Sequence, residues 1–169
     1  MTVRRSIRLA LLPLLALAAL PVRAADAPIA WRDWDQGLRE ARQSGRPVMV
    51  EVCTDWGAVC KRMDREVHSR PEVREYVAGH FIPVRLDAEA DSEVRYEGKD
   101  YTGRSLAARF RVTVYPTHVF LKPTGQHLIS VPGHVPAERF QLVMRYVAEG
   151  HLERGVDWEE FRRKQAAGR

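Results

Sequence analysis

The chain has 169 residues, of which 45% are hydrophobic and 29% are charged, a length that suits one domain with a substantial core. Its formal net charge is +5, but four of its 27 basic residues and none of its 22 acidic residues lie in residues 1–24, which leaves 27 − 4 = 23 basic against 22 acidic groups. This balance, without a basic patch interleaved with aromatic residues, argues against a nucleic-acid partner.

The first 24 residues have the pattern of a secretory signal peptide. A basic segment, Met1–Arg8, precedes an apolar segment, Leu9–Pro21, and small residues end at Ala24. The apolar run is too short and too interrupted by proline for a membrane span. We predict cleavage after Ala24, a mature domain of residues 25–169, a periplasmic location and no stable membrane insertion after cleavage. A retained N-terminal anchor is the alternative.

An amphipathic helix is predicted over Trp31–Ser44. Apolar side chains recur there at intervals of three and four residues, so one face of the helix is expected to pack on the core. Gly45 and Pro47 are typical of the end of a helix, and they place the boundary before the next element.

A buried strand is predicted over Val48–Cys53, which is short, apolar and rich in valine. Alternation sets the three valines on one face, and Met49, Glu51 and Cys53 on the other. A carboxylate in such a strand is costly unless it is paired or functional. Glu51 is therefore a candidate functional residue; the alternative is a wet strand edge or an ion pair with a lysine such as Lys61.

A helix is predicted to follow this strand, with Thr54 and Asp55 as N-cap candidates and Cys60 in its first turn. Unpaired backbone amides and the helix dipole favour a thiolate at such a position. The chain has two cysteines, and both lie in this window. Any thiol chemistry of the chain is therefore located here.

The remainder of the chain alternates strand and helix patterns. We predict helices over Ala58–Ser69, Pro71–Gly79, Arg104–Phe110, Pro136–Gly150 and Asp157–Gln165, and strands over Phe81–Asp87, Val119–Leu121 and His127–Val131. The Ala88–Gly103 segment is polar and glycine-punctuated, and we expect it to be irregular, with a turn at residues 96–99.

Four histidines raise the question of a metal site. His68 has no partner at a metal-ligand spacing, and we expect it to be exposed. His118, His127 and His134 match no HxxxH or CxxC pattern, and His118 facing His127 across strands would supply only two ligands. We therefore expect no metal and no cofactor.

The segment Thr54–Met63, TDWGAVCKRM, resembles the Trp-Cys-x-x-Cys-Lys active site of thioredoxin-fold proteins, with Gly57 in place of the first cysteine. Tyr115-Pro116-Thr117 resembles the cis-proline turn that faces this motif. The resemblance covers about residues 31–165 and is strongest to periplasmic thioredoxins associated with sulfur oxidation and to the C-terminal domain of the DsbD electron transporter. It implies a one-domain α/β thioredoxin fold, a central mixed sheet flanked by helices.

The same resemblance implies a set of site residues. Glu51 occupies the place of the buried acid that assists proton transfer at the second active-site cysteine. The implied substrate-binding residues surround the motif and the proline turn: Trp56, Gly57, Tyr115, Pro116 and Thr117. The implied partners are protein or peptide thiols in the cell envelope.

The missing first cysteine leaves three interpretations of the thiols open. Cys53 and Cys60 form a shifted redox pair or a static disulfide, Cys60 acts alone as a monothiol, or the groove beside Pro116 binds peptides without redox chemistry. Cys53 as an inert core residue is compatible with the last two. We expect a protein of thiol-redox descent, with Cys60, Cys53 and Glu51 as candidate catalytic residues and with two-cysteine activity reduced or lost.

Overall fold

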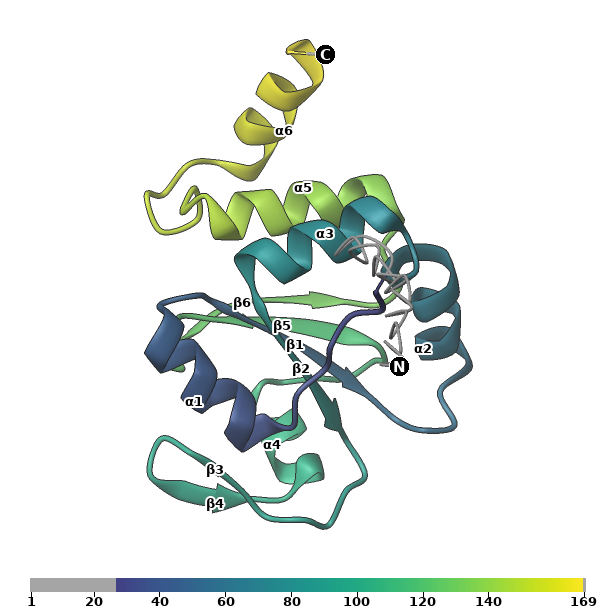
Figure 1. Cartoon of the computed structure of the whole chain (residues 1–169), viewed down its shortest axis with the longest axis vertical. Coiled ribbons are helices and arrows are strands. Elements are labelled where there is room, and N and C mark those ends of the chain that lie inside the picture. The colour runs from purple at the N-terminus through teal and green to yellow at the C-terminus, as the bar shows by residue number, and fades with distance from the viewer. Residues whose placement is uncertain (1–26, 169) are drawn as a thin grey trace, which may run out of the picture.

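The computed structural model describes residues 27–168, in which a four-stranded mixed sheet forms the centre of a thioredoxin fold (Figure 1). The strands are β1 (Val48–Cys53), β2 (Ile82–Asp87), β5 (Thr117–Leu121) and β6 (His127–Pro132), in the order β2-β1-β5-β6. The pair β1–β2 is parallel, whereas β1–β5 and β5–β6 are antiparallel. The expected fold class is confirmed.

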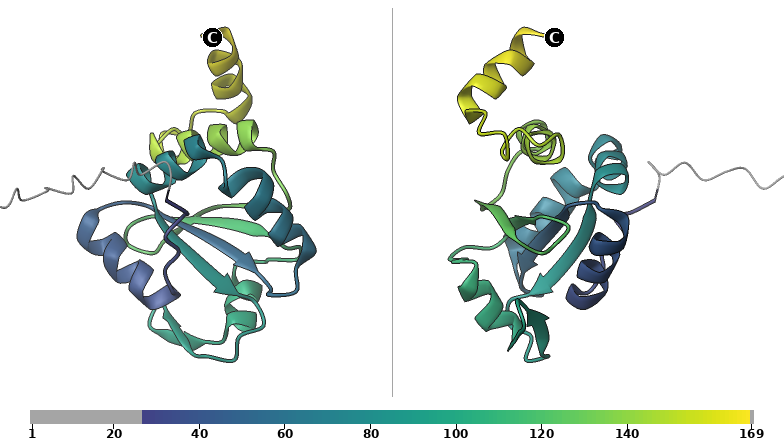
Figure 2. Two further views of the ribbon diagram at one scale, coloured as in Figure 1. Left: turned by 45° about the vertical axis from the view of Figure 1, so that its right-hand side comes forward. Right: turned by 90° about the vertical axis from the view of Figure 1, so that its left-hand side faces the viewer.

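Helices cover both faces of this sheet. One face packs against α1 (Trp34–Ser44) and α4 (Gly103–Arg109). The other packs against α2 (Ala58–Met63), a π-helix η1 (Asp64–His68), α3 (Pro71–His80) and α5 (Ala137–Ala148). The last helix, α6 (Trp158–Ala167), projects beyond α5 at the end of the molecule (Figure 2).

The side chains of β1 divide between two hydrophobic cores as the sequence alternation predicts. Val48, Val50 and Val52 lie in the core beneath α1 and α4. Met49 lies in the core beneath α3 and α5, so Glu51 and Cys53 face that side as well. The candidate functional side chains of this strand, Glu51 and Cys53, are therefore presented to α2 and η1.

The first helix is shorter than predicted, because its N-cap lies inside the predicted range. The side chain of Asp33 accepts a hydrogen bond from the backbone N–H of Gln36, which starts α1 at Trp34. Upstream of the cap the chain is extended, and Arg32 forms a parallel bridge to Val84 of β2. Trp31 thus lies outside the helix, on the second core.

The predicted helix Ala58–Ser69 is divided into α2 and η1. Five residues, Asp64–His68, have π-helical hydrogen bonding, which is rare in proteins and common at functional sites. Pro71 then begins α3 at its first position, as expected from its missing N–H. The π-turn changes the direction of the side chains that follow α2, with consequences for His68.

The segment Ala88–Gly103 is not wholly irregular, and that prediction is wrong in part. It contains a hairpin of β3 (Val94–Tyr96) and β4 (Lys99–Tyr101), with Glu97 and Gly98 at positive φ in the turn. Three-residue strands with polar residues give too weak an alternation to be recognised. Tyr96 attaches the hairpin to the core by donating its hydroxyl to the carbonyl of Gly125 at 3.1 Å.

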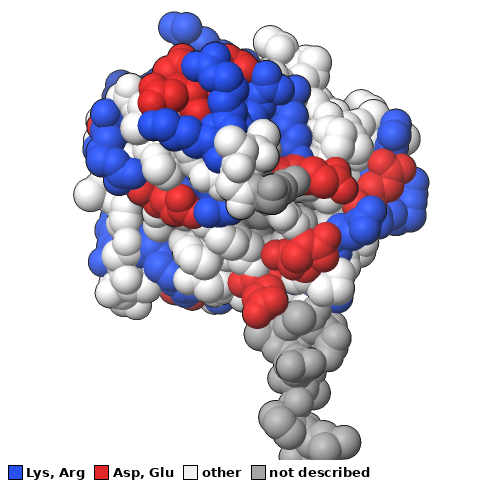
Figure 3. All heavy atoms as spheres, turned by 90° about the horizontal axis from the view of Figure 1, so that it is seen from above, with Lys and Arg blue, Asp and Glu red and all other residues white. Residues whose placement is uncertain are grey.

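Many charged groups lie on the surface at the α6 end of the molecule (Figure 3). On the face seen from above in Figure 3, Lys and Arg side chains lie beside Asp and Glu side chains. Ion pairs between residues close in sequence include Arg162–Glu159 in α6 and Arg145–Glu149, in which Glu149 is the C-cap of α5. Across the described residues, no helix combines the length and apolar character needed to cross a bilayer.

Candidate functional site

The two cysteines of the chain form a disulfide between the end of β1 and the start of α2. Their Cα atoms are 6.2 Å apart, and both side chains are almost fully buried. Seven positions separate Cys53 from Cys60, so the bond closes the short loop that contains Thr54–Gly57. Of the three interpretations of the thiols, the pairing of Cys53 with Cys60 is the one that this structure contains.

Cys60 lies in the first turn of α2, as predicted. The N-cap is Gly57, which supplies no side-chain hydrogen bond to the helix, so neither Thr54 nor Asp55 caps it. The backbone N–H of Gly57 instead donates to the carbonyl of Thr54 at 3.0 Å, which folds the loop into a turn. The Cys60 sulfur is thus placed at a helix N-terminus with no side chain at position 57 beside it.

The register of β1 and β5 places the turn Tyr115–Thr117 next to the disulfide. Val52 pairs with Thr117, so Pro116 comes one position further, at the level of Cys53. The Tyr115–Pro116 peptide bond is cis. The Thr117 hydroxyl donates to the carbonyl of Val114 at 2.8 Å, which closes the turn from the strand side. Two segments distant in sequence are thereby brought to one edge of the sheet.

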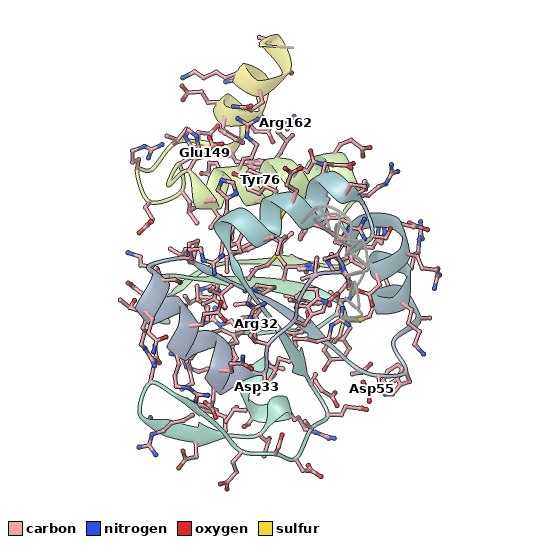
Figure 4. All side chains as sticks on the ribbon, viewed as in Figure 1. Arg32, Asp33, Asp55, Tyr76, Glu149 and Arg162 are labelled. Carbon is pink, nitrogen blue, oxygen red and sulfur yellow. A yellow bond between two sulfur atoms is a disulfide. The ribbon has the colours of Figure 1, made fainter. Side chains whose placement is uncertain are left out.

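A charged cavity of about 150 Å³ adjoins the disulfide. It lies at the end of β1 where Asp55 is labelled in Figure 4. The lining combines both cysteines with polar and charged side chains: Thr54, Asp55, Lys61, Asp64, Arg85 and Asp87. Glu51 is absent from this lining, whereas Arg85 and Asp64, which form an ion pair with each other, are part of it.

Large apolar side chains are exposed around the same loops. The exposed fraction is 67% for Trp56, 43% for Val59 and 46% for Val114. Trp56 precedes Gly57, and its indole N–H donates to the Glu89 carboxylate at 2.7 Å. These three are the large hydrophobic side chains that are exposed among the described residues, and they are therefore candidates for contact with a partner.

Glu51 belongs to a row of polar residues on three adjacent strands. The sheet register aligns it with Arg85 of β2 on one side and with His118 of β5 on the other. Arg85 donates to Glu51 Oε2 from Nε at 2.9 Å and from Nη2 at 2.5 Å. The ion pair expected for a buried carboxylate is therefore present, but its cation is Arg85, not Lys61, and Glu51 is fully buried instead of at a wet edge.

His68 lies in the interior, and the expectation that it is exposed is wrong. The π-helix η1 directs its ring towards the sheet. Nδ1 contacts Oδ1 of Asp64, which also belongs to η1, at 3.0 Å, and Nε2 contacts Nε2 of His118 on β5 at 3.2 Å. Trp31 and Phe140 pack against the ring edge-on, with centroids 5.3 and 5.8 Å away. Spacing alone gave no sign of this, because the partners lie on β5 and on the same π-turn.

Burial and the neighbouring cations shift the pKa values of the two carboxyls in opposite directions, whereas both lower the pKa of His118. Burial is the largest influence on Glu51 and raises the pKa of its carboxyl, against the effects of His68 and Arg85. Burial also acts on Asp64, but the hydrogen bonds from His68 and Arg85 outweigh it and lower the pKa of that carboxyl. The His118 pKa lies well below its usual value because the ring is fully buried, with His68 and Arg85 as further causes.

The pairing of His118 with His127 that we considered from the sequence does not form. His118 lies opposite Val131 and not opposite His127, so the facing pair that we considered is wrong. His127 bonds to the Ser130 hydroxyl on the exposed side of β6. Three buried donor groups, on Glu51, His68 and His118, are found within 4.8 Å of one another.

Comparison with known families and proteins identifies what this arrangement resembles. A family model described as a thioredoxin-like domain matches residues 34–148. The thiol:disulfide interchange protein DsbD of Ralstonia nicotianae is 32% identical over 112 residues, which make up 66% of this chain and 17% of that protein. The chain therefore spans less than a fifth of the length of this curated relative.

Solved structures give the same fold. A structure titled DsbH oxidoreductase superposes with a TM-score of 0.60 at 18% identity, covering 78% of this chain and 92% of the other. A thioredoxin from Thermus thermophilus also gives a TM-score of 0.60, at 26% identity, covering 73% of this chain and 90% of the other. The residues matched by the family model, 34–148, include β1, α2 and the proline turn.

Proposed function

Because the chain belongs to the thioredoxin-like family, we propose that it is an exported thiol–disulfide redox protein whose exchangeable disulfide is Cys53–Cys60. The observation that carries this proposal is the disulfide itself. It joins Cys60, at the family's second cysteine position, to Cys53 at the end of β1. Gly57 removes the usual attacking thiol, and Cys53 supplies a second sulfur in its place. The relative's name, thiol:disulfide interchange protein, is consistent with this chemistry.

The exchange with a client dithiol takes two steps. A client thiolate attacks Sγ of Cys60, which breaks the Cys53–Cys60 bond, forms a mixed disulfide and releases Cys53 as a thiolate that takes up a proton. The second client thiol loses its proton and attacks the client sulfur of the mixed disulfide, which releases the Cys60 thiolate to be protonated. The client is oxidised to a disulfide, and this protein gains two electrons and two protons.

The charged cavity supplies the environment for these steps. Arg85 lines it, and a guanidinium stabilises a thiolate that develops nearby. Glu51 holds Arg85 through two hydrogen bonds, so we assign Glu51 a positioning role, while its predicted part in proton transfer stays a prediction. The cis-Pro116 turn and the exposed Trp56 are the proposed client contacts, together with Gly57, Tyr115 and Thr117.

The proposed location rests on the sequence. Residues 1–24 lie outside the described residues, so cleavage after Ala24 and a periplasmic domain of residues 25–169 remain proposals supported by the charge and hydropathy of that segment. Protein or peptide thiols of the cell envelope are the proposed partners. N-terminal sequencing of the exported protein tests the cleavage site, and a chain that begins at Met1 in the membrane fraction contradicts it.

A redox titration tests the exchangeable disulfide. The mature chain is equilibrated in glutathione buffers, alkylated and weighed, so that each free thiol is counted by mass. We expect two thiols to appear together at a potential in the range of known redox proteins, roughly −270 to −120 mV. A value below about −300 mV would identify a static structural disulfide and overturn the proposal. Insulin reduction with dithiothreitol, for wild type and Cys60→Ser, measures the exchange itself.

A peptide-binding module without redox chemistry is the second candidate, favoured by the exposed apolar side chains around the site. In this case Trp56, Val59 and Val114 contact an extended peptide and the disulfide only fixes the loop. The double variant Cys53→Ser/Cys60→Ser separates the two candidates. The module is supported if the variant binds the client as well as wild type does and if wild type shows no exchange. Loss of both client capture and exchange supports the redox protein.

A further inference from the structure

A group of buried polar side chains behind the disulfide has features that thiol exchange does not require. Glu51 comes from β1, His68 from η1 and His118 from β5, and the side chains of all three are buried. Their donor atoms lie within 4.8 Å of one another, inside a core that is otherwise apolar. Burying three polar side chains together is costly unless their donors and acceptors are used.

The two imidazoles are spaced as ligands of one ion would be. Their Nε2 atoms are 3.2 Å apart. Two nitrogens bound at about 2.05 Å in a tetrahedral site are separated by about 3.3 Å, so this distance suits a shared ion as well as it suits a hydrogen bond. The position of the ring nitrogens therefore does not have to change much for a metal to bind.

The contacts of His68 select the tautomer that a ligand requires. Nδ1 faces Asp64 Oδ1 at 3.0 Å, and because a carboxylate accepts hydrogen bonds, this contact favours the tautomer with its proton on Nδ1 and its Nε2 lone pair towards His118. A histidine that donates one N–H to a carboxylate and offers its other nitrogen to an ion is the usual outer-shell arrangement of metal sites. Asp64 holds His68 in place through the π-turn that they share.

Glu51 supplies a third donor that has no partner at present. Arg85 bonds to Oε2 only, and Oε1 is buried without a hydrogen bond. His68 is the group beside it, with Nδ1 at 3.8 Å from Oε1. The two carboxylates of the group, Glu51 and Asp64, both pair with the single guanidinium of Arg85. When both carboxylates are ionised, this set of three groups has a net charge of −1, which favours the binding of a cation.

An apolar wall surrounds the donors. Phe140 lies 4.6 Å from the His118 ring and 5.8 Å from the His68 ring, measured between centroids. Trp31 closes the side of His68, and the Arg85 guanidinium stacks on the Trp31 ring at 4.6 Å. Such a shell limits the access of bulk solvent and strengthens the attraction between an ion and its ligands.

We propose that Glu51, His68 and His118 form a binding site for a divalent metal ion of the zinc class, with Asp64 as the outer-shell partner of His68. Two imidazoles and one carboxylate form a common ligand set for zinc, with a fourth position left for water. Movement of the Glu51 carboxylate towards the imidazoles completes the first three contacts. Neither sulfur belongs to the site, although Glu51 also holds Arg85 beside the disulfide.

Metal titration of the oxidised mature chain tests the site, because the disulfide keeps both sulfurs from acting as ligands. Zn²⁺ is added in a calorimeter after chelator treatment, and Co²⁺ is added separately as a visible-absorbing probe. We expect one ion per chain, no binding to His68→Gln or His118→Gln, and affinity reduced by about 10- to 100-fold in Asp64→Asn. The matched control is His127→Gln, which changes an exposed histidine and should bind as wild type does.

Other outcomes contradict the site. Absence of stoichiometric binding to wild type overturns the proposal, as does binding that persists in both histidine variants or that disappears in Cys53→Ser/Cys60→Ser. The buried variants are first checked by circular dichroism. If they do not fold, X-ray absorption of the zinc-loaded wild type decides: two imidazole ligands support the site, and a shell without imidazole overturns it.

Discussion

A Cβ atom placed on Gly57 lies 3.0 Å from Sγ of Cys60. This is the separation between Cβ and the far sulfur across a disulfide with an S–S bond of about 2.05 Å. Position 57 therefore keeps the geometry of a first active-site cysteine although glycine occupies it. The carbonyl of Thr54 lies 3.1 Å from the same point, so the loop must yield slightly to accept a side chain.

From this relationship we predict that Gly57→Cys forms a disulfide between the new thiol and Cys60 at the expense of the Cys53–Cys60 bond. The new thiol lies at a helix N-terminus, where the dipole lowers its pKa, so it is the better attacking group. Peptide mapping by mass spectrometry should find Cys53 free, and insulin reduction should exceed that of wild type. Comparison with Gly57→Cys/Cys53→Ala shows whether Cys53 competes. An unchanged Cys53–Cys60 bond would contradict the prediction.

The native disulfide should contribute modestly to stability, because it closes a short loop. For a loop of about eight residues the chain-entropy relation gives roughly 2.5 kcal/mol at 25 °C. We predict that reduction lowers the free energy of unfolding by about this amount, measured by urea unfolding with and without reductant. Cys53→Ser/Cys60→Ser serves as the control, since reductant should leave its unfolding curve unchanged.

The sequence predicts the sheet and its helices well because β1, β2 and α5 carry strong hydrophobic patterns. The same alternation places Glu51 and Cys53 on one face, as observed. The predicted exposure of His68 is wrong for a physical reason. Helical periodicity does not anticipate the π-helix η1, and these five π-helical residues rotate every side chain that follows. The pairing of Glu51 with Arg85 depends on strand register, which neither residue's local sequence reveals.

Close packing between α1 and β2 gives a prediction about glycine. A Cβ on Gly37 would lie 2.1 Å from Cγ2 of Val84, whereas a Cβ on Gly79 in α3 meets nothing within 4 Å. Gly37→Ala should destabilise the fold by about 1–3 kcal/mol through overpacking. Gly79→Ala should stabilise it by up to about 1 kcal/mol through helix propensity. Urea unfolding measures both, and equal effects of the two substitutions would contradict this account of the packing.

Tyr96 provides a test of pH dependence at a site remote from the disulfide. Burial, with Glu97 as a further cause, raises the pKa of Tyr96 to about 12. In the unfolded chain a tyrosine has a pKa of about 10, so the folded state retains the phenolic proton that the unfolded state loses. The contribution of Tyr96 to stability is therefore complete below pH 10 and disappears as the pH rises from about 10 to about 12.

We predict that Tyr96→Phe is less stable than wild type at pH 8, by about 1 kcal/mol, because the bond to the Gly125 carbonyl is lost. As the pH rises above 10, wild type loses stability more steeply than Tyr96→Phe, since only wild type carries this buried phenol. The measurement is the difference between the two melting temperatures at intervals from pH 8 to the highest pH at which wild type folds. Other groups that titrate in this range affect both proteins alike and cancel in the difference. A difference that stays constant with pH would show that the Tyr96 phenol ionises as readily in the folded chain as in the unfolded one.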